Sequence, residues 1–343
     1  MLKKLLTVRN LVTLLLAVGL FVVSDLLGLK VPSPVISLAA EPIFHLGPLT
    51  ISNSLFTAWI VMILLILLAY FATRRIPKNL AQASNRELVP SGVQNVMEMV
   101  VETLYNFIKG IAGHWTPKFF PVVATIFFFV LASNWFGLLP GVGSIGILEH
   151  PHKAGEVGFI ARGAILTGIR ADAEHKTGGE KQPVKDEKAA GDQKKESAGY
   201  IVVPLFRAPS TDLNFTLALA VMAVGLTQYF GALALRGSYF KKFFDLSGFK
   251  RDAFDGVVGL FVSVLELVSE FAKILSFSFR LFGNIFAGEV LLGVMAFLIP
   301  YFASLPFYGL EVFIGFIQAV VFMMLALVFF VMATLGHGGE EHH

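Results

Sequence analysis

The sequence predicts an all-α integral membrane protein: a five-span core that ends in two long, steeply tilted C-terminal helices, with a possible extra span at the N-terminus. Of its 343 residues, 55% are hydrophobic and 15% are charged, whereas an ordinary soluble domain has about 25% charged residues. The apolar residues form long runs, and about 20 such residues cross the hydrocarbon core of a bilayer. These runs are expected to be helical, because an open strand cannot satisfy its backbone hydrogen bonds in lipid.

The first apolar run, Leu11–Leu27, is open to two interpretations. Three basic residues precede it and Ser37-Leu38-Ala39 follows it, an order that also occurs in cleaved signal peptides. The length of the run and its distance from the small residues favour a retained helix. Residues 1–40 are therefore expected to form an N-terminal anchor or a signal-like segment.

Five further apolar runs form the predicted core. They are Ser54–Thr73, Phe119–Leu139 and Leu213–Leu235, followed by the longer stretches Gly256–Ile299 and Pro306–Leu335. Two segments between them are predicted to lie along the inner membrane surface, the amphipathic run Asn95–Ile108 and the basic, aromatic stretch Tyr239–Phe249. Residues 41–148 thus contain the first core spans, and residues 201–343 contain the C-terminal ones.

The distribution of lysine and arginine places both termini on the inner side of the membrane, because short inner loops are enriched in these residues. The segments 74–118 and 236–251 are basic, whereas the short outer segment before Ser54 carries Lys30 alone. The outer loop 149–200 is too long for this rule. It holds nine acidic and nine basic residues in 52 positions, and we expect it to be a flexible insert that buries too little apolar surface to fold.

Composition excludes several kinds of site. The absence of cysteine excludes disulfides, thiol nucleophiles and cysteine-based metal centres. The formal charge of +3 is too small to indicate nucleic acid as a partner. His150, His152 and His175 are scattered in the charged insert and are interpreted as surface histidines, so neither a metal nor a cofactor is predicted.

Ionisable residues are concentrated in the last two apolar stretches. Each costs on the order of 3 kcal/mol in the membrane centre, so each is a functional hypothesis. The six are Glu266, Glu270, Lys273, Arg280, Glu289 and Glu311. Arg280 lies near the middle of Gly256–Ile299, too far from either end for its side chain to reach the membrane surface, so it must face a polar cavity or a partner.

Helix geometry arranges these residues around Arg280. As one helix, the 44 residues of Gly256–Ile299 would be about 66 Å long, so the helix must tilt steeply or break into two. Glu266, Lys273 and Asn284 then share a face with Arg280, and Glu289 lies on the opposite face. Two further pairs share a face by their spacing: Glu270 with Lys273, which predicts a structural ion pair, and Glu311 with Gln318.

This layout suits two aqueous half-paths separated by a fixed positive charge. Protons could move along carboxylates and polar side chains, whereas a cation could not pass the arginine. The chain has no phosphate-binding loop, no phosphorylatable aspartate motif and no pair of equal halves. The energy source or the moving part must therefore belong to another protein.

Several motifs resemble subunit a of F-type ATP synthases. The resemblance covers about Ser54 to Ala333 apart from the insert, with its landmarks in the family's order. They are Pro90–Asn95, Asn134–Gly141, Pro209–Asn214, Arg280-Leu281-Phe282-Gly283-Asn284, Ala287-Gly288-Glu289 and Gln318-Ala319.

The resemblance implies a role for each site residue. Arg280 resembles the essential arginine that faces the rotating ring of c subunits. The implied outer proton path holds Asn284, Glu289, Glu311 and Gln318, with Asp212 and Asn214 near its entrance. The implied inner path holds Glu266, Ser269 and Ser276. Implied partners are the c-subunit ring, b-type peripheral stalk subunits and the lipid bilayer, in a bacterial inner membrane with a cytoplasmic C-terminus. Sodium in place of the proton is left open, since the binding carboxylate would lie on the c subunit.

Three departures separate the chain from the family pattern. Glu311 stands where some members carry histidine, so two carboxylates, Glu289 and Glu311, are expected to share the outer path. Ile274 replaces a proline found in many members, which predicts a straighter helix. The insert and the N-terminal segment are additional. Two other functions fit the buried charges alone: a stand-alone secondary transporter or ion channel, and a scaffold whose charges only join helices.

Overall fold

The computed structural model describes residues 40–47, 49–74, 76, 92–142, 145–149, 157–162, 165–170, 201–236, 239, 253–298 and 304–335. The candidate span Leu11–Leu27 and all of Tyr239–Phe249 except Tyr239 lie outside these residues. The chain forms two compact units, each described by itself. One contains residues 143–205 and 289–309, and the other contains residues 38–142, 206–288 and 310–343.

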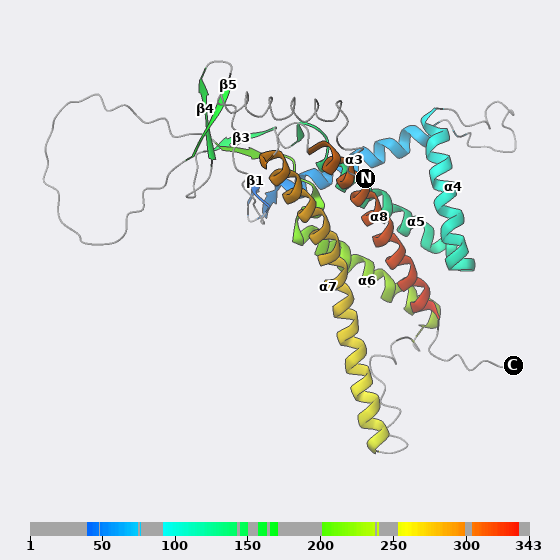
Figure 1. Cartoon of the computed structure of the whole chain (residues 1–343). Helices are drawn as coiled ribbons and strands as arrows, with labels where there is room; N and C mark the ends of the chain where they lie inside the picture. Colours follow the sequence, from blue (N-terminus) through cyan, green and yellow to red (C-terminus); the bar gives the residue numbers. More distant parts are fainter. Residues whose placement is uncertain are drawn as a thin grey trace, which may run out of the picture. The chain divides into compact units, whose positions relative to one another are not determined.

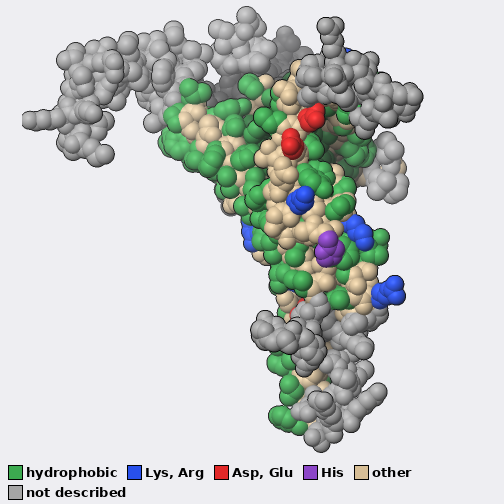
Figure 2. Space-filling model, turned by 90° about the vertical axis from the view of Figure 1, so that its right-hand side faces the viewer, with side chains coloured by type: hydrophobic (Ala, Val, Ile, Leu, Met, Phe, Trp, Pro, Cys, Tyr) green, Lys and Arg blue, Asp and Glu red, His purple; other side chains and the backbone are tan. Residues whose placement is uncertain are grey.

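The described residues contain five helical stretches that are long and apolar enough to cross a membrane, which confirms the predicted fold class. They comprise α3 (Asn53–Thr73), the stretch Val93–Gly137, α6 (Leu213–Leu235), α7 (Ala253–Leu298) and α8 (Ser304–Thr334). On the face drawn in Figure 2, the coloured side chains of the described residues include many hydrophobic and few charged ones, as expected for a surface in contact with lipid.

Helix α3 follows a short antiparallel hairpin of β1 (Pro42–Leu46) and β2 (Leu49–Ser52). The Ser52 hydroxyl caps the helix by accepting a hydrogen bond from the Leu55 amide at 3.4 Å. Side chains on one stripe of α3, including Asn53, Ser54 and Thr57, are fully buried. The polar start of this helix therefore belongs to the interior of the protein.

The stretch Val93–Gly137 consists of two helices rather than one. Helix α4 (Val93–Ala112) ends at Gly113, whose φ of +53° suits glycine. A 3-10 turn, η2 (Gly113–Trp115), then leads into α5 (Thr116–Gly137). The predicted amphipathic run Asn95–Ile108 lies within α4, where Ile108 is buried against the core and Met99 is exposed.

Helices α5, α6, α7 and α8, whose ribbons are labelled in Figure 1, contribute side chains to one hydrophobic core in the larger unit. At one end, the rings of Phe119, Phe230 and Phe330 lie 4.9–5.6 Å apart, which joins α5, α6 and α8. Phe277 of α7 contacts Phe322 of α8 at 4.9 Å. Aromatic packing of this kind fixes the helices against one another without polar groups.

Helix α7 is unbroken over 46 residues, which corresponds to about 69 Å. Of the two sequence-based alternatives for this stretch, the single long helix is the one found. Arg280 lies 27 residues after its first residue, so it occupies the middle region rather than an end.

The charged insert, which the sequence predicts to be flexible, contains short strands among its described residues. Strands β3 (Gly146–Glu149) and β6 (Ile201–Pro204) pair at its base, and β4 (Val157–Arg162) and β5 (Ile165–Arg170) form a hairpin within it. Composition averaged over 52 residues hides the short run Val157–Arg170, which is rich in residues that favour strands. The charged residues are concentrated after this run.

Candidate functional site

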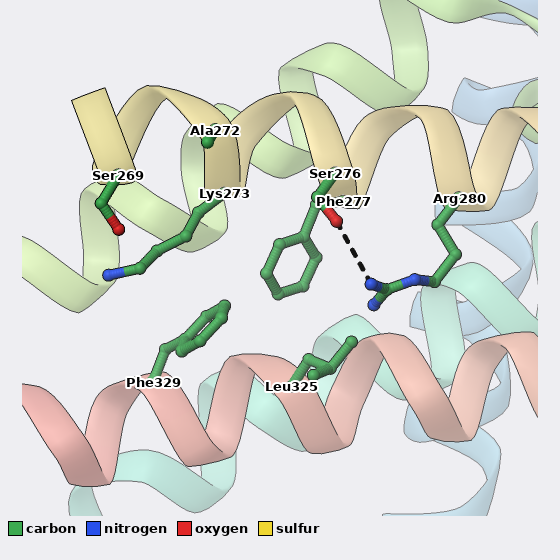
Figure 3. A pocket seen from close by; sticks show the side chains of 8 residues that line it. All are labelled: Ser269, Ala272, Lys273, Ser276, Phe277, Arg280, Leu325 and Phe329. Atoms are coloured by element: carbon green, nitrogen blue, oxygen red, sulfur yellow. Dashed lines mark hydrogen bonds between the residues drawn. The ribbon is translucent and has the colours of Figure 1, made fainter.

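Arg280 is held by a residue of its own helix. Its Nη2 atom donates a hydrogen bond to the Ser276 hydroxyl at 3.2 Å, one turn earlier in α7 (Figure 3). The guanidinium is therefore directed toward the N-terminal half of the helix. Arginine remains charged under all conditions in proteins, so this contact positions a permanent positive charge.

A groove of about 260 Å³ extends from Arg280 along that half of α7. Helix α8 supplies its opposite wall, and both small polar and apolar side chains line it (Figure 3). The lining residues are Ser269, Ala272, Lys273, Ser276, Phe277, Arg280, Leu325 and Phe329. The groove gathers the two serines that the sequence assigned to the inner path, and it brings them to the arginine.

The ion pair of Glu270 and Lys273 is present in the structure. Lys273 Nζ lies 2.9 Å from Glu270 Oε1, and it also lies over the Phe329 ring at 5.2 Å from its centroid. The lysine charge is thus compensated by a carboxylate and by the face of an aromatic ring. Glu266 lies about one turn before Ser269 on α7, half-buried and outside the groove lining.

On the other side of Arg280, a polar contact joins α7 to α8. Asn284 Nδ2 donates a hydrogen bond to Gln318 Oε1 at 2.8 Å. Gln318 is only 3% exposed, and its Nε2 atom has no hydrogen-bond partner among the described residues. Glu311, seven residues earlier on α8, is 4% exposed. The shared face expected for Glu311 and Gln318 is therefore the buried face of this helix.

Glu311 packs directly on the backbone of α7. A Cβ atom built on Gly288 would overlap the Glu311 carboxylate, so only glycine fits at this position without a shift. Glu289 is the next residue of α7 and is exposed. It belongs to the smaller unit while Glu311 belongs to the larger one, so the expected pairing of these two carboxylates stays a prediction.

Asp212 lies in a buried polar cluster at the start of α6. Its carboxylate accepts hydrogen bonds from the Ser54 hydroxyl at 2.5 Å and from the Asn214 amide at 2.9 Å. The second bond caps α6, while the Asn214 side chain is exposed. The structure thus gives Asp212 two structural contacts at the position where the sequence predicted a path entrance.

Sequence reasoning missed several buried polar residues around Asp212. Thr57 accepts a hydrogen bond from the Arg207 amide at 3.2 Å, and the hydroxyls of Thr216 and Ser278 lie 3.1 Å apart. The first contact joins α3 to the segment before α6, and the second joins α6 to α7. The sequence does show serine and threonine residues inside the apolar runs. It does not show which of their hydroxyls are buried in the protein and which face lipid.

Within the described part of the chain, no group of three or more histidine, aspartate or glutamate side chains is placed to hold a metal ion. His150, His152 and His175 lie outside that part. The described polar side chains nearest Arg280 along α7 and α8 are the hydroxyls of Ser269 and Ser276, the Glu270–Lys273 ion pair, and the amides of Asn284 and Gln318.

Comparison with known proteins decides the family. Residues 55–331 match the family described as ATP synthase A chain. The chain belongs to this family. It is also similar to ATP synthase subunit a of Moorella thermoacetica, with 28% identity over 297 residues that cover 86% of this chain and 96% of the relative. The A chain match includes Arg280, the groove and the Asn284–Gln318 contact, and it confirms the resemblance read from the motifs.

Proposed function

We propose that this chain is the stator subunit of an ATP synthase membrane sector and provides two proton half-channels to a rotating ring of c subunits. One observation carries the proposal. Arg280 separates two polar regions along the same pair of helices: the groove lined by Ser269 and Ser276 on one side, and on the other the exposed Asn284, hydrogen-bonded to the buried Gln318, with the buried Glu311.

The predicted orientation assigns these regions to the two sides of the membrane. With the C-terminus of the chain inside, α7 begins on the inner side, so the groove opens inward and Glu311 lies toward the outer side. Glu266 with Ser269 and Ser276 then forms the inner path. The outer path contains Glu289, Glu311, Asn284 and Gln318, with Asp212 and Asn214 at its entrance. The membrane is a bacterial inner membrane in this proposal.

Proton transfer follows from the charge of Arg280. A proton from outside passes Glu311 and neutralises a carboxylate of the ring that has just left Arg280. The neutral site enters lipid, where a bare carboxylate would be costly. After nearly a full turn it reaches the inner groove, and the approach to Arg280 favours the ionised carboxylate, so the proton leaves inward.

Arg280 also prevents ions from passing directly between the two half-channels without rotation of the ring. A proton or a metal cation moving directly from Gln318 to Ser276 would have to pass a guanidinium that is fixed in the path. A membrane potential supplies about 2.3 kcal/mol per charge per 100 mV for the rotation. The b-type stalk would hold the chain stationary against the ring.

The test uses the complete complex reconstituted in liposomes. The proposal predicts ATP-driven acidification in sodium-free buffer that an uncoupler abolishes. Sodium-dependent pumping that persists with the uncoupler would replace the proton with sodium and leave the two-path arrangement in place. Ion transport by this chain alone, at the rate of the complex, would instead establish the stand-alone transporter and overturn the proposal.

A further inference from the structure

We infer that Asn134 and Trp135 of α5 are positioning residues that set the height and rotation of the α8 segment carrying Glu311 and Gln318. The inference rests on the proposed function, because its consequence is the placement of the outer proton path. Neither residue carries an ionisable group, so neither would exchange a proton itself.

Two adjacent side chains of α5 bond to the backbone of α8. Asn134 Nδ2 donates a hydrogen bond to the Gly315 carbonyl at 3.1 Å, and Trp135 Nε1 donates one to the Val312 carbonyl at 3.0 Å. Both acceptors lie inside α8, where each carbonyl already accepts a helix amide. A carbonyl oxygen has a second lone pair, so it can accept the additional donor without loss of the helix bond.

The two acceptors lie about one turn apart on α8. A single bond would allow the helix to rotate or slide about it, whereas two bonds at different heights restrict both motions. A slip of α8 by one residue would move every side chain about 1.5 Å along the axis and about 100° around it. The two donors on α5 therefore select one register of α8.

Gly315 brings the two helices close enough for these bonds. A Cβ atom built on Gly315 would lie 3.2 Å from Asn134 Cβ, which is closer than most packing contacts, and 3.4 Å from Trp135 Cδ1, at the lower limit of ordinary contact. The glycine thus provides the surface on which both donor residues rest. The same close approach recurs at Gly288, where Glu311 packs on α7.

The segment of α8 that accepts these two hydrogen bonds also contains buried polar groups of the proposed outer path. Glu311 directly precedes Val312, and Gln318 follows Gly315 by about one turn. On the far side of the segment, Gln318 accepts the hydrogen bond from Asn284 at 2.8 Å. Bonds to α5 on one side and contacts with α7 on the other therefore determine together where the Glu311 carboxylate lies.

Asn134 and Trp135 differ in the exposed fraction of their side chains, and this makes Trp135 the better residue to substitute. Asn134 is 2% exposed, so its replacement also alters the core, whereas Trp135 is 42% exposed and loses little packing when phenylalanine replaces it. Trp135→Phe removes the indole N–H and keeps an aromatic side chain. Trp59→Phe is the matched control, because Trp59 lies on α3 and is 44% exposed.

The experiment measures ATP synthesis by the whole complex in liposomes, with the pH on the outer side varied and assembly checked by blot. Trp135→Phe is expected to assemble, to lower the rate by about two- to tenfold, the range for one hydrogen bond, and to shift the pH dependence of proton uptake. Trp59→Phe is expected to match the wild type. Trp135→His, whose ring Nε2 can occupy the place of the indole nitrogen, is expected to restore much of the rate above neutral pH.

A second variant changes the α8 side of the contact with Asn134 and Trp135. Gly315→Ala is expected to shift the same pH profile, whereas Gly225→Ala, at an exposed site on α6 with no described atom within 4 Å of the added carbon, is not. Wild-type pH profiles for both Trp135→Phe and Gly315→Ala would overturn the inference. If Arg280→Ala also left transport intact, the proposed function would fail as well, so the two failures are distinguishable.

Discussion

The carboxylate of Glu311 on α8 occupies the space that a side chain at Gly288 on α7 would need. Glu311 is also 4% exposed, so a buried acidic group of α8 packs against the backbone of α7. Burial of such a group is expensive unless it interacts with partners or serves a function. The packing of Glu311 on Gly288 therefore fixes the position of a carboxylate that the proposed outer proton path uses.

Gly288→Ala is expected to displace the Glu311 carboxylate and to impair proton transport. Overpacking of this kind costs about 1–3 kcal/mol, so assembly is expected to weaken as well. ATP-driven pumping normalised to the amount of assembled complex measures the effect on transport. Gly225→Ala provides the control, because it adds the same methyl group at an exposed helical site on α6. Equal pumping by both variants would show that Glu311 tolerates displacement.

Asn284 and Gln318 are expected to act as a pair. Their hydrogen bond of 2.8 Å joins α7 to α8 next to Arg280, and either leucine substitution removes it. Because the second substitution has no bond left to break, the double variant should lose little more activity than either single one. A double-mutant cycle on the rate of ATP synthesis measures this coupling. Additive losses would mean that the two amides act independently.

Ser276→Ala is expected to lower the rate of proton transfer by about two- to tenfold, as for loss of one hydrogen bond. The serine hydroxyl accepts the bond from Arg280, so its loss leaves the guanidinium less well oriented. Ser276→Thr retains a hydroxyl and is expected to retain more activity. Proton transfer by Ser276→Thr that is no faster than by Ser276→Ala would contradict the orienting role.

Asp212 allows a structural and a proton-path role to be separated. Asparagine caps a helix about as well as aspartate, whereas alanine in place of either costs about 1 kcal/mol. Asp212→Asn is therefore expected to assemble normally, and, if the carboxylate belongs to the outer entrance, to slow proton uptake. The measurement is ATP synthesis at several outer pH values. Uptake at the wild-type rate would leave Asp212 with its cap and its contact with Ser54 alone.

The spans could be predicted because each depends on a local property, the length of an apolar run. The predicted run Leu213–Leu235 coincides with α6. Arg280 could also be singled out, since a charge far from both ends of an apolar helix is visible in the sequence. The single helix α7 was one of two alternatives, and its unbroken path follows from the absence of proline between its ends.

Contacts between helices could not be predicted in the same way. Leu325 and Phe329 line the groove beside Arg280, yet nothing distinguishes them from the other apolar residues of α8. The contact between Gly288 and Glu311 forms only because α7 packs on α8. The hydrogen bonds donated by Asn134 and Trp135 form only because α5 packs on α8. No local sequence pattern indicates which helices pack together. The hairpin of β4 and β5 was not predicted, because the charged composition of the whole insert outweighs the short run of residues that favour strands.

The most direct test of the central claim is ATP-driven proton pumping in inverted membrane vesicles, with Arg280→Ala compared with the wild type and assembly verified by blot. Arg74→Ala serves as the control, because Arg74 lies at the end of α3 rather than within a span. The proposal predicts that Arg280→Ala complexes assemble but do not pump, while Arg74→Ala complexes do. Pumping at the wild-type rate by assembled Arg280→Ala complexes would contradict the assignment of Arg280 to the ion-transfer step.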